Sequence, residues 1–152
     1  MTKSRRYGQS SIRVRSPDAR DPDGRTALMM AAFNGHKETV RLLLDRGAII
    51  DTRDAMGRTA LMYAAAGPYS QTVQLLLERG ADLNIRGKEE GWTALMFAAA
   101  EGQANVIRVL LAHGADLKVA DGDGDTAHDF AVKNGHGAAI QLLKRDISHE
   151  SK

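Results

Sequence analysis

The residues that most suggest chemistry form an acidic, glycine-rich run, Asp121-Gly122-Asp123-Gly124-Asp125. Alternating carboxylates of this kind begin the calcium-binding loop of helix–loop–helix proteins. The rest of such a loop is missing, because Thr126 stands where the loop needs its turn glycine and Val132 where it needs a bidentate glutamate. The run is therefore predicted to be a turn in register with others in the chain, without a bound metal.

Other side chains with catalytic or metal-binding potential do not converge in the sequence. A metal or acid–base site needs histidines to meet carboxylates in one place. The chain has no cysteine, and its five histidines are dispersed: His36, His113, His128, His136 and His149. Gly122 and Gly124 lack the lysine that completes a phosphate-binding loop. We therefore predict no catalytic residue, no metal site and no cofactor, so that the chain is not an enzyme.

Positive charge is concentrated at the N-terminus. Residues 1–20 contain six basic residues and one acidic residue, whereas the whole chain has 21 basic and 19 acidic residues and a net charge of +2. Such a segment could bind the phosphates of nucleic acid or an anionic membrane surface. Tyr7 is its one aromatic residue, which gives little basis for stacking on nucleic-acid bases. Nucleic acid is therefore not the expected partner.

The N-terminal segment has few large apolar side chains. Residues 1–17 are too polar to form a core of their own, and we expect most of them to form a mobile arm. Within the arm, Ile12 and Val14 alternate with polar residues in the manner of a strand. This alternation could instead place the two side chains over the open end of the first structural unit.

An internal repeat reveals the elements that position these residues. The motif Gly-x-Thr-Ala recurs four times, with intervals of 33, 34 and 33 residues between the threonines Thr26, Thr59, Thr93 and Thr126. A second, apolar block ending in Gly-Ala recurs at 40–48, 73–81 and 107–115. A fixed period of this length marks a stacked array, in which each unit buries its apolar face only against its neighbours.

Each unit is predicted to contain two helices. The repeated threonine is a good N-cap for the first helix, and Thr126 with Asp129 has the spacing of a capping box. The first helix should end at Asn34-Gly35 in unit one and by Gly67 in unit two, where Pro68 follows. The second helix has apolar residues at i, i+3 and i+4, which form an inner stripe.

The Gly-x-Thr-x-Leu-x-x-Ala core resembles the ankyrin repeat, whose signature is Thr-Pro-Leu-His-x-Ala. The resemblance covers roughly residues 18–145. It implies an all-α fold, an ankyrin-repeat α-solenoid of paired antiparallel helices with short β-hairpin fingers. Alanine replaces the proline of the motif, and Met29, Met62 and Met96 replace its histidine. Alanine and methionine both suit helices, but these changes remove any histidine-based hydrogen-bond network.

The predicted organisation is an arm at 1–17, a repeat domain at 18–147 and a loose tail at 148–152. The repeats fall at about 18–50, 51–83, 84–117 and 118–147, and Lys144 in place of a leucine favours a C-terminal cap in the last one. No apolar run approaches the length of about 20 residues needed to cross a membrane, and no secretory signal is recognised. We expect a cytoplasmic monomer.

The resemblance implies a binding surface, here called the concave face, made from the fingers and the exposed sides of the first helices. The finger column reads Arg25, Arg58, Trp92 and Asp125, and the helix columns read Met30, Tyr63, Phe97, Phe130 and Phe33, Ala66, Ala100, Lys133. Trp92 is expected to be exposed, because its equivalents are charged and the third finger is one residue longer. Packing between neighbouring helices is the alternative explanation for the aromatic columns. The predicted partner-binding residues are Arg25, Met30, Phe33, Arg58, Tyr63, Lys88, Glu89, Trp92, Phe97 and Glu101.

The function implied by the resemblance is non-catalytic protein–protein recognition through the concave face and the fingers. The identity of the protein partner does not follow from the sequence. Two alternatives stay open. One is an adaptor that binds nucleic acid or an anionic membrane surface through the basic arm, and the other is a regulator or inhibitor of an enzyme.

Overall fold

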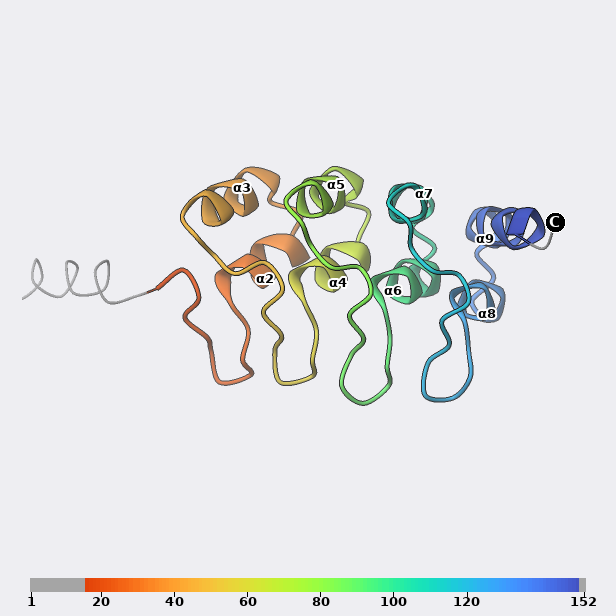
Figure 1. The fold of residues 1–152 in the computed structure, drawn as a ribbon, viewed down its shortest axis with the longest axis horizontal. Coiled ribbons are helices and arrows are strands. Elements are labelled where there is room, and N and C mark those ends of the chain that lie inside the picture. The colour runs from red at the N-terminus through yellow and green to blue at the C-terminus, as the bar shows by residue number, and fades with distance from the viewer. Residues whose placement is uncertain (1–15, 151–152) are drawn as a thin grey trace, which may run out of the picture.

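The structure, a computed structural model, describes residues 16–150. Their eight helices form four antiparallel pairs in two rows (Figure 1). The helices are α2 (Ala27–Phe33), α3 (Lys37–Asp45), α4 (Ala60–Ala65), α5 (Ser70–Glu78), α6 (Ala94–Glu101), α7 (Ala104–Ala112), α8 (Ala127–Lys133) and α9 (Gly137–Glu150). The first helices of the pairs lie side by side in one row and the second helices in the other. The predicted all-α solenoid is confirmed, whereas most of the predicted arm lies outside the described residues.

The repeated threonines start the first helices as predicted. Thr26 Oγ1 accepts a hydrogen bond from the backbone N–H of Met29 at 3.3 Å, and Thr59, Thr93 and Thr126 do the same in their own repeats. The predicted capping box is also present, because Asp129 Oδ2 accepts a hydrogen bond from the Thr126 backbone N–H at 2.9 Å. Each cap satisfies backbone donors that a helix start leaves unpaired.

The core lies between the two rows of helices and between neighbouring repeats. Alanines of the first helices allow these helices to approach closely, and Ala32, Ala65 and Ala99 are completely buried. Leucines of the second helices fill the space between the rows, and Leu76, Leu110 and Leu143 are completely buried as well. The small alanine pairs of the repeat therefore lie where neighbouring first helices meet, and the larger leucine pairs lie between the two rows of helices.

The fingers are tight turns without regular strands among the described residues, apart from one isolated antiparallel bridge between Ala120 and Thr126. An aspartate closes three of them, because its backbone N–H donates to the carbonyl four residues later. Gly57 is required at the tip of the second finger. Its φ is +77°, and an added Cβ would lie 2.7 Å from the backbone nitrogen of Lys88 in the third finger.

A ladder of arginines joins the fingers to one another. Arg20, Arg53 and Arg86 occupy equivalent positions, and each donates a hydrogen bond to a backbone carbonyl of the following repeat. The acceptors are the carbonyls of Arg53, Arg86 and Ala120. The ladder ends at Ala120, which has no donor to continue it. This ladder was not predicted from the sequence, although the arginines share the period of the threonines.

The C-terminal helix α9 continues to Glu150, beyond the predicted end of the repeat domain at residue 147 and into the segment at 148–152 that was expected to be a loose tail. Within residues 16–150, none of the helices combines the length and the apolar character that crossing a membrane would require.

Candidate functional site

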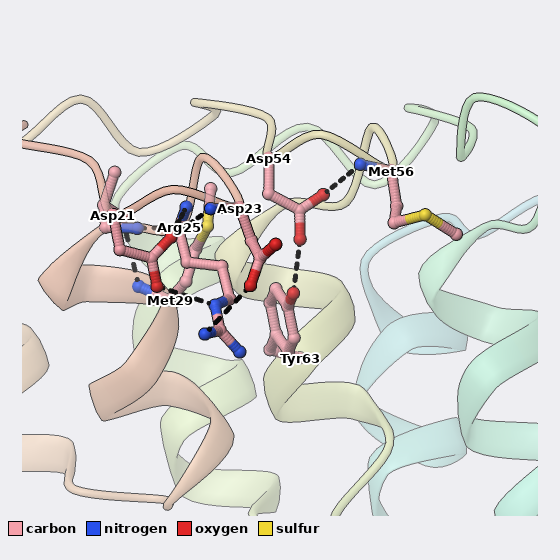
Figure 2. A network of polar contacts seen from close by, with 8 residues as sticks. Asp21, Asp23, Arg25, Met29, Asp54, Met56 and Tyr63 are labelled. Carbon is pink, nitrogen blue, oxygen red and sulfur yellow. Dashed lines mark hydrogen bonds and ion pairs between the residues drawn. The ribbon is translucent and has the colours of Figure 1, made fainter.

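The first finger holds its arginine with two carboxylates (Figure 2). Asp21 Oδ2 accepts from Arg25 Nε at 2.9 Å, and Arg25 also pairs with Asp23 at 3.3 Å. Asp21 Oδ1 accepts the backbone N–H groups of Asp23 and Arg25 at 2.9 and 2.8 Å. The hydrogen bond from the Arg25 backbone is the main reason why the pKa of Asp21 lies below its usual value. The Arg25 guanidinium is therefore held by carboxylates of its own finger.

The second finger is joined to helix α4 through a tyrosine. The Tyr63 hydroxyl donates to Asp54 Oδ2, while Asp54 Oδ1 accepts the backbone N–H of Met56 at 2.9 Å (Figure 2). Asp54 Oδ1 also accepts the backbone N–H of Arg58 at 2.9 Å. Burial first, and then the hydrogen bond to the Asp54 carboxylate, raise the pKa of Tyr63 to about 12. The phenol therefore remains a neutral donor over the whole physiological pH range.

The contribution of Tyr63 to stability is expected to disappear at alkaline pH. Because its pKa is about 12 in the folded state and 10.0 in the reference state, the folded protein holds the proton more tightly, and stability falls as pH rises from 10 through 12. Urea unfolding of wild type and Tyr63→Phe across this range measures the effect. The variant should be less stable at neutral pH and should show a shallower alkaline decline. Equal slopes for the two proteins would contradict the assignment.

An aromatic pair bridges repeats one and two on the concave face. Phe33, the last residue of α2, meets Tyr63 of α4 edge to face, with ring centroids 6.0 Å apart and planes at 90°. Phe33 is 51% exposed, and Met30 one turn earlier is half-buried. Edge-to-face contact fixes both rings, yet it leaves half of the Phe33 surface in water.

Trp92 occupies a different environment from the one predicted. Its indole Nε1 donates to Asp121 Oδ2 at 3.1 Å, and its ring lies 4.9 Å from that of Phe97 and 4.5 Å from that of Phe130. The side chain is half-buried and joins repeats three and four. The expectation that Trp92 stands exposed is wrong, because it turns towards the finger of the next repeat. Packing between neighbours, the alternative explanation, accounts for this residue.

The acidic run that resembles a calcium loop works as a turn. Asp121 Oδ1 accepts the backbone N–H groups of Asp123 and Asp125 at 3.0 and 2.9 Å, and its other oxygen holds Trp92. Burial raises the pKa of Asp121, but these hydrogen bonds outweigh it, and the pKa lies below its usual value. Both carboxylate oxygens thus already have partners within the protein.

The third finger differs from the others at its base. Gly87 donates its backbone N–H to the Trp92 carbonyl at 2.8 Å, the bond that an aspartate makes in the other fingers. The turn therefore lacks the aspartate carboxylate that accepts backbone N–H groups in the other fingers, and its exposed tip carries Lys88 and Glu89. The Lys88 backbone N–H donates to the Met56 carbonyl at 2.9 Å, which ties this longer finger to its neighbour.

The predicted partner-binding residues fall into separate groups. Arg58, Trp92 and Phe97 lie together, with the Arg58 guanidinium 5.4 Å from the centre of the Phe97 ring. Phe33 and Tyr63 form the exposed aromatic pair described above. The remaining residues are more dispersed: Arg25 and Met30 line a groove at the N-terminal end, Lys88 and Glu89 are exposed on a finger, and Glu101 is exposed at the end of α6.

A family model described as ankyrin repeats (three copies) matches residues 9–87 and again 86–152. The matches span most of the chain and agree with the helical pairs of the structure. The chain belongs to the ankyrin repeat family. Ankyrin repeats are generally protein–protein interaction modules and are typically non-catalytic. A search of curated proteins gave no significant match.

Proposed function

We propose that this chain is a non-catalytic module that binds a protein partner across the concave face of repeats one and two. The observation that carries the proposal is the exposure of Phe33. This residue is 51% exposed, whereas its equivalents in the other repeats are Ala66, Ala100 and Lys133. A large aromatic ring on the surface adds nothing to solubility, and such residues are enriched where proteins bind one another.

Residues beside Phe33 supply the rest of a binding surface. Tyr63 holds the Phe33 ring edge to face, so that little side-chain freedom remains to be lost on binding. Arg58, which belongs to the finger column, lies with its guanidinium over the ring of Phe97. Arg58 Nε and Glu90 Oε1 are buried without a hydrogen-bond partner among the described residues, although Arg58 Nη2 lies 3.7 Å from that carboxylate oxygen. The ion pair with Glu90 therefore helps to hold the Arg58 guanidinium in place beside the Phe97 ring.

Trp92 has an indirect role in this proposal. It packs against Phe97 and fixes the ring on which Arg58 lies. A partner therefore meets Phe33, Tyr63 and Arg58, while Trp92 maintains the shape of the surface below. The proposed binding surface therefore lies on the first two repeats and not on the third finger.

The experiment is affinity capture from a lysate of the source cells with three baits: wild type, Phe33→Ala and Val132→Ala. Val132 is a suitable control, since it is 50% exposed and lies on α8 in the last repeat. A protein retained by wild type and Val132→Ala but lost with Phe33→Ala supports the proposal. A set of captured proteins that is identical for all three baits contradicts it.

The alternative of an adaptor to nucleic acid or to an anionic membrane surface rests on the basic arm at 1–17, which lies almost wholly outside the described residues. Phosphate contacts lose affinity steeply as salt is raised, whereas an interface centred on an aromatic residue does not. Salt titration of the captured complex therefore separates the two functions.

A further inference from the structure

The N-terminal end of the array carries an open groove that the proposed binding face does not explain. Its volume is about 910 Å³, within the range of built ligand sites. Ala27 and Met30 of α2 and Leu42 and Leu43 of α3 give it an apolar floor. Ser16 forms part of its edge.

The floor of this groove is the surface that later repeats bury against the repeat before them. Ala27 is exposed, whereas its equivalents Ala60, Ala94 and Ala127 are 1–2% exposed. Leu42 is 49% exposed, whereas Leu75 in the same position of repeat two is 4% exposed. Repeat one therefore presents an apolar stacking surface, although the terminal repeats of such arrays normally present a polar one.

We propose that residues 11–15 of this chain cover the groove, with Ile12 and Val14 packed against Leu42 and its neighbours. The fifteen residues before Ser16 begin at the edge of the groove, since Ser16 itself lines it. At about 3.3 Å per extended residue, Val14 lies within roughly 7 Å of that edge and Ile12 within roughly 13 Å. The segment therefore reaches the floor without any long connection.

The segment has one apolar side, which suits the floor of the groove, and one charged side, which suits the solvent. In extended form, Ser11-Ile12-Arg13-Val14-Arg15 directs Ile12 and Val14 to one side and its arginines to the other. Tethering at the groove gives the segment an effective concentration of about millimolar, so weak apolar contacts suffice to hold it. Arg25 at the rim is already paired with Asp21 and Asp23. Arg20 and Arg46 also line the groove, so the two arginines of the segment must lie on its water-facing side.

The test uses the absence of cysteine from the chain. Leu42→Cys introduces one thiol into the groove, and Val132→Cys introduces one at the other end of the array. The two parent residues are matched in exposure, at 49% and 50%. The rate of maleimide labelling of each thiol is measured in the full chain, first with the natural arm, then with Ile12→Ser/Val14→Ser and then with Arg13→Ser/Arg15→Ser.

With the natural arm, the thiol at position 42 should react about tenfold more slowly than the thiol at position 132. Ile12→Ser/Val14→Ser should remove this difference, while Arg13→Ser/Arg15→Ser should keep it. Thermal melting of each variant shows that the array is folded. Equal rates with the natural arm would overturn the proposal. Protection that persists with Ile12→Ser/Val14→Ser, or that grows with protein concentration, would also overturn it and would point to a second copy in the groove.

Discussion

Leu76→Ala is expected to lower the free energy of unfolding by about 2–5 kcal/mol, the range for removing a leucine from a close-packed core. Leu76 is completely buried in α5, and α5 packs against α3, α4 and α7. In a stacked array each repeat is stabilised only by its neighbours, so a cavity here weakens contacts on both sides of repeat two. Equilibrium unfolding in urea measures the loss.

Val132→Ala serves as the control for this prediction, because it also shortens an aliphatic side chain but at a position that is 50% exposed. The expected change is within about 0.5 kcal/mol. If Val132→Ala proves as destabilising as Leu76→Ala, the assignment of the buried row of leucines is wrong.

Trp92→Ala is expected to cost about 3 kcal/mol of stability, at the low end for a truncated aromatic residue because the side chain is only half-buried. The substitution removes contacts with two aromatic rings and leaves Asp121 Oδ2 without its indole donor. Trp92→Phe keeps the ring contacts and loses only the hydrogen bond, at a cost of about 1 kcal/mol.

Thermal and urea unfolding of the two variants distinguish this role from the one suggested by the sequence. The graded order of wild type, Trp92→Phe and Trp92→Ala is the outcome that the contacts predict. Unfolding curves of Trp92→Ala that superimpose on those of wild type would show instead that the tryptophan is a surface anchor, as its charged equivalents in the finger column suggested.

The helices and their starts could be predicted from the sequence, because the signals for them are local. Thr126 caps a helix through a residue three positions away, and the apolar spacing of the second helices lies within a few turns of one element. The repeat period then stacks these elements in the only order that buries their apolar faces. Fold class therefore follows from short-range patterns and one measured interval.

The environment of Trp92 could not be predicted in the same way. Its hydrogen-bond partner Asp121 is 29 residues away and belongs to the next repeat. The residues equivalent to Trp92 in the other fingers are Arg25, Arg58 and Asp125. Their types suggest exposure, but they do not determine which way the Trp92 side chain points. A usable signal does exist in the aspartate at the base of three fingers, because Gly87 replaces it in the third and so changes that turn.

The arginine ladder was open to prediction and was missed. Arg20, Arg53 and Arg86 lie 33 residues apart, the interval already seen for the threonines. Each guanidinium bonds to a backbone carbonyl of the following repeat. Because the stacking of the repeats follows from the same interval, the shared period of the three arginines was a usable signal for bonds between neighbouring repeats.

Whether a protein partner binds through Phe33 on the concave face is decided by the dissociation constant of the purified, captured partner for wild type, Phe33→Ala and Val132→Ala. Interfaces concentrate their energy in a few aromatic and arginine residues, so Phe33→Ala should weaken binding by at least about tenfold, or 1.4 kcal/mol. Val132→Ala should bind as wild type does, and both variants should melt near the wild-type temperature. Equal dissociation constants for wild type and Phe33→Ala would contradict the claim.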